Sequence, residues 1–305
     1  MELSWNGTDI TGSVNITGCV HTENAYGRCD CLELMLDNAG RWYGYAPEED
    51  DEIIFTHDGY TTGSLYLNAI IPVGDQYRVL ATSTKQAAAR QSYETYKDTT
   101  LQGLFTFCAA EIGMEGKLFG VDGRLPYTFV LRPYEGAGAF LNRVGEWEGL
   151  CVKTRDNAIL GVSVTYAQEM ETRAGIYIDA IQEGVTWQSC KRGKYASLTV
   201  QTPWAKATAW DTGMNGINAL TITNLPAMDN TQAGRWARGL LLMHNRQAET
   251  LEIEKELDTS LAPMDKVNIS GDTAMNGDWI VNETEHDFIN KRTTLEMLRC
   301  IETVK

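Results

Sequence analysis

The sequence has no run of apolar residues that approaches the ~20 needed for a membrane-spanning helix, so membrane insertion is not expected. Its first twelve residues lack a basic segment followed by an apolar core, and we therefore expect no secretory signal. Basic residues are also scarce: 26 Lys and Arg stand against 41 Asp and Glu, for a formal net charge of -15. Because nucleic-acid binding needs a basic footprint, sequence-specific nucleic-acid binding is not expected.

Recognisable catalytic and metal-binding motifs are absent as well. The four histidines lie far apart and none has a ligand spacing, and the sequence contains no P-loop, G-x-S-x-G elbow or dinucleotide-binding glycine pattern. The seven cysteines include one close pair, Cys29 and Cys31, without a second pair to complete a zinc site, so we interpret them as small buried hydrophobes in a reducing compartment. The acidic run Pro47 to Glu52 is interpreted as a solvated loop in preference to a metal site. We predict no catalytic residue, no metal and no cofactor.

Short strands and turns fill the first part of the chain. Each strand candidate is bounded by Gly, Asn or Asp, and the candidates are Leu3 to Trp5, Val14 to Cys19, Cys29 to Leu36, Glu52 to Thr56 and Gly63 to Ile71. Several short strands at this spacing predict a small β-barrel over residues 1–84.

Helical periodicity then appears, which predicts an α/β insertion domain over residues 85–168. The expected elements are helices at Lys85 to Tyr96, Thr99 to Gly113 and Gly136 to Leu150, a strand at Pro126 to Pro133, and a hairpin formed by Cys151 to Lys153 and Ile159 to Tyr166.

The remaining residues, 169–305, return to β character and predict a second barrel. The strand candidates are Tyr177 to Ile181, Thr186 to Ser189, Ser197 to Gln201, Ala219 to Thr223 and Glu249 to Glu256, followed by a terminal meander of Lys266 to Ser270, Asp278 to His286 and Thr293 to Ile301. Asn276-Gly277 is a strong hairpin signal, because both residues tolerate the positive φ angles of a primed turn.

A helix over residues 230–248, capped by Asn230 or Thr231, is expected to cover this second barrel. We further expect Asp278 to Ile301 to share a sheet with strands from Tyr177 to Thr223, and Gly136 to Tyr166 to form a separate module. The Trp-rich connection from Pro203 to Met214 has no predicted place.

Three segments, the first of them in two parts, resemble in their order the phage late control protein D family of baseplate hub proteins. These are WNGTDIT at residues 5–11, CDCLELMLDNAGRWYGYAPEEDDEI at 29–53, GAGAFLNRVGEWEGLCVKTRDNAILGV at 136–162 and NGDWIVNETEHDFINKRTTLEMLR at 276–299. The order of the segments carries more weight than any one of them.

The resemblance implies a mainly β protein with an α/β insertion: two tube-type β-barrels related as a pseudo-repeat, plus a small helix-and-hairpin domain. It implies a homotrimer that joins the hexameric tail tube protein to the trimeric central spike protein. Such a baseplate hub would also contact other baseplate proteins and allow DNA or the tape measure protein to pass. The particle would be a phage virion or a phage-tail-like contractile particle, including a bacteriocin, assembled in the bacterial cytoplasm. The chain lacks a β-helix spike or lysozyme-like segment, so the spike is expected to be a separate chain, and no enzymatic activity is expected.

Three aromatic residues that follow one of the predicted strands are candidates for interface contacts. Trp42, Tyr43 and Tyr45 are predicted as interface anchors, with a place in the core as the alternative. The acidic excess would suit a lumen through which DNA or the tape measure slides without sticking. The alternatives are a tail-associated cell-wall hydrolase and a carbohydrate-binding tail module.

Overall fold

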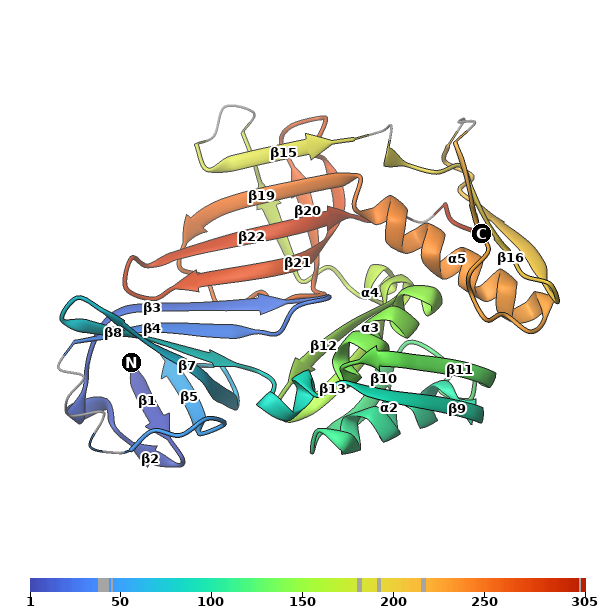
Figure 1. Cartoon of the computed structure of the whole chain (residues 1–305). Coiled ribbons are helices and arrows are strands. Elements are labelled where there is room, and N and C mark those ends of the chain that lie inside the picture. The colour runs from blue at the N-terminus through green and yellow to red at the C-terminus, as the bar shows by residue number, and fades with distance from the viewer. Residues whose placement is uncertain (38–43, 45, 180–182, 191–192, 215–217, 302) are drawn as a thin grey trace.

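The computed structural model describes residues 1–37, 44, 46–179, 183–190, 193–214, 218–301 and 303–305 (Figure 1). Its strands form a large antiparallel sheet system with few helices, so the predicted class, mainly β with an α/β insertion, is confirmed. Among the described helices, none is long and apolar enough to cross a membrane.

The N-terminal strands form a first β unit around one apolar core. Its strands are β1 (Glu2–Trp5), β2 (Thr8–Asp9), β3 (Asn15–Asn24), β4 (Cys31–Asp37), β5 (Glu52–His57), β6 (Tyr60–Thr61), β7 (Leu65–Val73) and β8 (Gln76–Thr82). Alternation in β4 turns Leu32, Leu34 and Leu36 into the core, where they pack with Phe55. Strand β8 was not predicted; it pairs with β7 across a turn at Gly74, which has a positive φ of 64°.

The C-terminal strands form a second β unit around its own core. They are β14 (Ala174–Tyr177), β15 (Val185–Ser189), β19 (Glu249–Glu256), β20 (Lys266–Ser270), β21 (Gly277–Asp287) and β22 (Arg292–Arg299). Leu251, Trp279, Leu295 and Met297 are buried at its centre. The three predicted terminal strands are therefore confirmed: Lys266–Ser270 has the predicted boundaries, and those of the other two are shifted by one to two residues.

Strand β21 belongs to both β units. One edge of it pairs with β22, while its other edge is divided: Gly277 to Ile280 pair with β20, and Glu283 to Asp287 pair with β3. A register shift between Val281 and Glu283 accompanies the change of partner. The described strands of both units consequently form one 14-stranded sheet, in which β3 lies directly beside β21 (Figure 1).

The middle of the chain forms an α/β module whose strands lie outside the 14-stranded sheet. Its elements are β9 (Ser92–Thr100), α2 (Leu101–Glu111), β10 (Glu115–Phe119), β11 (Pro126–Glu135), α3 (Ala137–Glu148), β12 (Leu150–Arg155), β13 (Ala158–Ser163) and α4 (Val164–Glu169). Strands β10, β13 and β12 form one sheet, and β9 pairs with β11. As predicted, residues 136–166 take no part in the 14-stranded sheet.

The helix predicted at Lys85 to Tyr96 is wrong. Only a short 3-10 turn forms at Gln86–Ala89, and the residues from Ser92 onward are strand β9. The Ala-rich start suggested a helix, but SYETYKDTT is rich in Tyr and Thr, which favour strands, and pairing with β11 decides the outcome. The next helix begins as expected, since Thr100 caps α2 by accepting a hydrogen bond from the Gly103 amide.

The helix predicted over residues 230–248 forms, but it does not cover the second β unit. Helix α5 (Asn230–Arg246) packs against α3 and against a small sheet of β16 (Ser197–Gln201), β17 (Lys206–Trp210) and β18 (Ala219–Ile222). Asp229, one residue before the predicted caps, accepts the capping hydrogen bond. The apolar stripe of α5 shares one core with Trp147 and Leu198. Helical periodicity identifies the buried face of a helix but not the partner of that face.

Two further expectations are corrected by this small sheet. Residues 186–189 do join the sheet of β21 and β22 as β15, whereas Ser197 to Gln201 and Ala219 to Thr223 do not. The unplaced connection from Pro203 to Met214 contains β17, the hairpin partner of β16. The boundaries predicted at 84/85 and 168/169 stay a prediction.

The close crossing of α3 and α5 gives a direct test of this packing. A Cβ on Gly239 would lie 2.2 Å from the Trp147 carbonyl oxygen and 2.5 Å from the Gly149 amide nitrogen. We expect Gly239→Ala to push the helices apart and lower the free energy of unfolding by about 1–3 kcal/mol. Chemical denaturation monitored by tryptophan fluorescence measures the change.

Gly234→Ala, on the same helix, is the matched control. Its nearest neighbour would be the Ala207 Cβ at 3.6 Å, an ordinary contact. This variant should be unchanged or more stable by roughly 0.5–1 kcal/mol, because Gly is a poor helix former. Equal effects of the two substitutions would contradict the close crossing.

Candidate functional site

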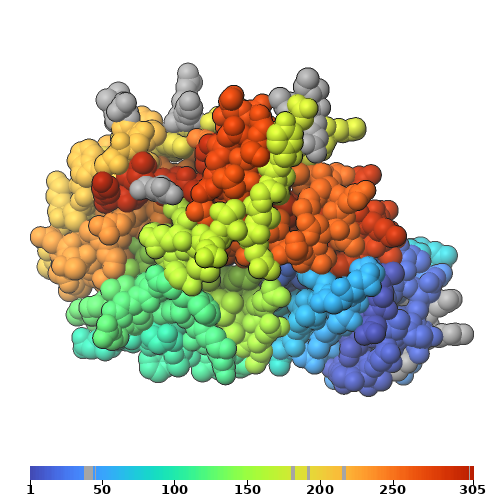
Figure 2. Space-filling model, turned by 180° about the vertical axis from the view of Figure 1, so that it is seen from behind, coloured from blue at the N-terminus to red at the C-terminus, as the bar shows by residue number. Residues whose placement is uncertain are grey.

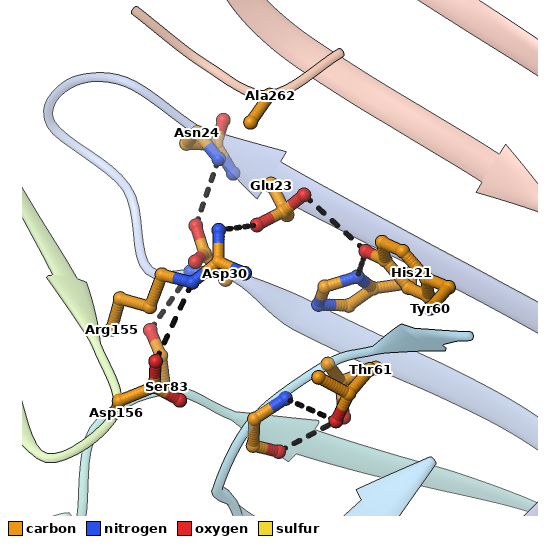
Figure 3. A network of polar contacts seen from close by, with 12 residues as sticks. His21, Glu23, Asn24, Asp30, Tyr60, Thr61, Ser83, Arg155, Asp156 and Ala262 are labelled. Carbon is orange, nitrogen blue, oxygen red and sulfur yellow. Dashed lines mark hydrogen bonds and ion pairs between the residues drawn. The ribbon is translucent and has the colours of Figure 1, made fainter. Parts of the chain in front are cut away.

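A buried polar cluster lies where the two β units and the α/β module meet, and we call it the three-way junction. It consists of His21, Glu23, Asp30, Tyr60, Ser83, Arg155 and His286. Figure 3 shows all of these except His286, and Figure 2 shows from behind how the blue-to-cyan, green and orange-to-red parts of the chain pack together. The side chains come from β3, β6, β12, β21 and the residues that flank β4 and β8.

A chain of hydrogen bonds runs from β12 into the sheet. Arg155 Nη1 donates to Glu23 Oε1 at 3.1 Å, and the Tyr60 hydroxyl donates to Glu23 Oε2 at 3.3 Å. The Tyr60 hydroxyl lies 2.6 Å from His21 Nδ1. Since Tyr60 gives its single proton to Glu23, His21 must donate from Nδ1, which leaves Nε2 as the unprotonated nitrogen. That Nε2 atom is buried and has no partner among the described residues.

A second set of contacts joins the first β unit to the α/β module. Asp30 Oδ1 accepts a hydrogen bond from the Asn24 amide at 2.8 Å, and the Asp30 amide donates to Ser83 Oγ at 3.0 Å. Ser83 Oγ lies 2.5 Å from the Thr154 hydroxyl on β12. Burial raises the pKa of Asp30 to about 6, although the charge of Lys153 opposes the increase.

The pairing of β3 with β21 brings two distant histidines together. His21 and His286 are register partners, and both are completely buried. His286 Nδ1 lies 3.0 Å from the Thr293 hydroxyl, and its ring packs edge-on against Tyr60. Burial lowers the pKa of His21 to about 3, with further lowering from the nearby His286, Arg155 and Lys153. Burial also lowers the pKa of His286.

These residue types could serve in acid–base chemistry, but their placement does not suit a substrate. Glu23 is 2% exposed and both histidines are 0% exposed, so no reacting atom could approach them. The arrangement fixes three parts of the fold relative to one another. It could not be found from sequence, because no motif links residues 21, 155 and 286.

A second feature is the outer face of the 14-stranded sheet, which we call the acidic face. Residues directly opposite in neighbouring strands share a face, and this places the glutamates of four strands together. They are Glu252, Glu254 and Glu256 on β19, Glu296 on β22, Glu283 and Glu285 on β21, and Glu33 on β4. Burial and the neighbouring Glu296 raise the pKa of Glu283, while Arg28 opposes the shift.

The edge of this sheet carries a partly uncovered tryptophan. Trp187 on the edge strand β15 stands opposite the buried Leu251, on the core side, yet it is 41% exposed. Trp204 and Trp210 are also exposed, beside and on β17. Trp204 and Trp210 belong to the Trp-rich connection that had no predicted place, and no sequence motif marks Trp187. The predicted anchors Trp42, Tyr43 and Tyr45 lie outside the described residues.

The cysteines differ in their exposure. All seven cysteines are free; Cys19, Cys108 and Cys151 are buried as expected, but Cys29 and Cys190 are exposed. The described residues contain no group of three or more His, Cys, Asp or Glu side chains that could hold a metal ion.

No family model matches the sequence, and no curated protein is similar to it. Solved structures do resemble it. A 43 kDa tail protein of prophage MuSo2 from Shewanella oneidensis superposes with a TM-score of 0.76 at 11% identity, covering 100% of this chain and 99% of that chain. A tail protein from Neisseria meningitidis superposes with a TM-score of 0.76 at 10% identity, covering 99% of this chain and 97% of that chain. A component of the Escherichia coli type VI secretion system superposes with a TM-score of 0.64 at 11% identity, covering 99% of this chain and 78% of that chain. That component is described as similar to the phage T4 tail proteins gp27 and gp5.

These superpositions define the class of the fold. Over its whole length, the chain has the fold of phage tail proteins, which is shared by a type VI secretion component. The likeness to tail proteins that the sequence indicated is thus confirmed at the level of the fold.

The buried His21 predicts a specific acid sensitivity. Because its folded pKa is about 3, below the ordinary 6.5, the unfolded chain binds a proton that the folded chain excludes. The contribution of His21 to the free energy of unfolding is therefore complete above pH 6.5 and is lost as the pH falls towards 3. His21→Gln retains a donor for Tyr60. This variant should reduce the slope with which the free energy of unfolding falls on acidification, by up to about 1.4 kcal/mol per pH unit.

Denaturant unfolding between pH 7 and pH 4.5 measures this effect. His244→Gln is the control, because His244 is exposed on α5 and should change the pH dependence less. Parallel stability curves for the His21 variant and the parent protein would contradict the assignment.

Proposed function

We propose that this chain is a structural baseplate hub of a phage tail or a phage-tail-like contractile particle. In this role it is a trimeric adaptor between the hexameric tail tube and the trimeric central spike. The observation that carries the proposal is the continuous sheet, in which two β units from opposite ends of the chain stand side by side through the β3–β21 pairing. The tail-protein fold supports it.

Symmetry explains why two joined units suit an adaptor. Three copies of a chain with two similar units present six units around an axis, so a threefold ring can match a sixfold tube. The β3–β21 pairing fixes the angle between the units within each chain. A flexible linker would not hold them in a ring position.

The acidic face suits the wall of a passage. It carries glutamates from the three neighbouring strands β19, β22 and β21 and from β4, one strand further on, with Arg28, Arg78 and Arg292 as partial compensation. A wall of like charge repels DNA and leaves it free to slide, and the tape measure protein would occupy the same channel. We propose that this face lines the lumen and that no sequence-specific nucleic-acid binding occurs.

The edge strand β15 suits the contact between copies. Among the described strands β15 pairs only with β19, and an edge of this kind with a half-exposed Trp187 is a template for a neighbouring strand or apolar patch. A permanent contact would bury well over ~1,000 Å². Trp204 and Trp210 are candidates for contacts with other baseplate proteins, and Trp42, Tyr43 and Tyr45 remain predicted anchors.

The role is structural and not enzymatic, and its location is the baseplate of a virion or tail-like particle. Assembly in the bacterial cytoplasm follows from this location. The polar side chains that resemble catalytic groups are buried in the three-way junction, where they hold the fold.

The oligomeric state tests the proposal. Light scattering should give three times the chain mass, and Trp187→Lys should weaken the trimer by roughly 30-fold or more, as expected for an interface hot spot. Trp210→Lys, an equally drastic change on an exposed tryptophan outside the large sheet, should leave the trimer intact. A stable monomer that hydrolyses peptidoglycan or binds glycans would overturn the proposal in favour of the alternatives.

A further inference from the structure

A pocket of about 350 Å³ lies between the first β unit and the α/β module. One wall comes from the chain before β4 and after β8, including Arg28, Cys29 and Lys85. The opposite wall comes from the start of α3 and from Lys153 on β12. Cys29 and Ala139 are exposed, which opens the pocket to solvent.

The charged residues that line the pocket are all basic. They are Arg28, Lys85 and Lys153, and no Asp or Glu is among the described lining residues. This is unusual in a chain with a formal net charge of -15. Two of the three have weak partners: Arg28 lies 3.7 Å from Glu283 with its side chain largely exposed, and the Lys85 ammonium lies 4.7 Å from the centre of the Tyr66 ring.

Lys153 is the most informative of the three. It is 5% exposed, and among the described residues it has no ion pair or hydrogen bond. The charge of Lys153 lowers the pKa of Asp30, so this carboxylate, which also accepts a hydrogen bond from the Asn24 amide, supplies part of the negative charge that balances the ammonium. A buried ammonium is costly unless negative charge and hydrogen-bond acceptors compensate it, and an anion in the pocket would complete this compensation.

The start of α3 provides a second attraction for negative charge. Its N-cap, Gly136, has no side chain to accept a hydrogen bond, and the first turn contains no acidic residue. Gly138 and Ala139 of this turn line the pocket, and a helix start carries partial positive charge. Asn142, one turn later, has a buried side-chain oxygen without a partner among the described residues. A rotated Asn142 amide would present its NH2 group to an anion.

We propose that this pocket binds an oxyanion, a phosphate or carboxylate group, with Lys153 at its base and the first turn of α3 as one wall. Three cations, a free helix start and an amide that can donate all match an acceptor-only ligand. The volume admits a small molecule or the end of an acidic side chain. Because the pocket joins the first β unit to the α/β module, its occupant would also tie these two parts together.

Cys29 provides a direct readout, because it lines the pocket. Alkylation of Cys29 by iodoacetamide, followed by peptide mass spectrometry, reports whether the pocket is filled. Cys190 is exposed elsewhere on the chain and serves as the internal control. We expect sodium pyrophosphate or sodium succinate to slow the modification of Cys29 about tenfold at ten times its Kd, as mass action requires, and to leave Cys190 unaffected.

Variants distinguish anion binding in the pocket from a general effect of salt on the alkylation of Cys29. Lys153→Gln should abolish the protection, and Lys85→Gln at the rim should weaken it severalfold. Lys117→Gln, an exposed lysine paired with Glu115 on β10, should retain it. Protection by pyrophosphate assigns the phosphate class, and protection by succinate alone assigns the carboxylate class. The proposal is overturned if neither anion protects Cys29 beyond sodium chloride of equal ionic strength, or if protection survives in Lys153→Gln.

Discussion

The pairing of β21 with β3 is the contact on which the other features of the molecule depend. Without it, the two β units would be separate sheets at opposite ends of the chain. The register matters as much as the contact, because a slip of one residue would turn every side chain to the other face. In the observed register, Glu283 and Glu285 face solvent with the glutamates of β19 and β22, while Thr284 and His286 face inward.

The inward residues explain how the third part of the molecule is fixed. Apolar residues fill the centres of both β units, but the seam between them contains His21, Glu23 and His286. A polar seam needs specific partners: Tyr60 bonds to His21 and Glu23, Arg155 bonds to Glu23, and Thr293 bonds to His286. Since Arg155 belongs to the α/β module, its hydrogen bond to Glu23 also orients this module relative to the seam.

Sequence patterns predicted elements with strong local signals and failed where the outcome depends on distant partners. The terminal strands and helix α3 were found because alternation, helical periodicity and Gly149 are local features. The first half of strand β9 was predicted as a helix because alanines precede it. Its pairing with β11, which the sequence pattern does not reveal, makes it a strand. The partner of α5 and the junction of His21 with His286 were not predictable, because nothing near either histidine indicates the other.

The orientation of the acidic face in an assembled particle tests the central claim most directly. Electron cryomicroscopy of the chain bound to its tail tube would reveal it. The account predicts a threefold ring of six β units, with Glu252 and Glu285 lining the central channel. A ring in which this face points outward, or a single copy on the outside of the tube, would contradict it.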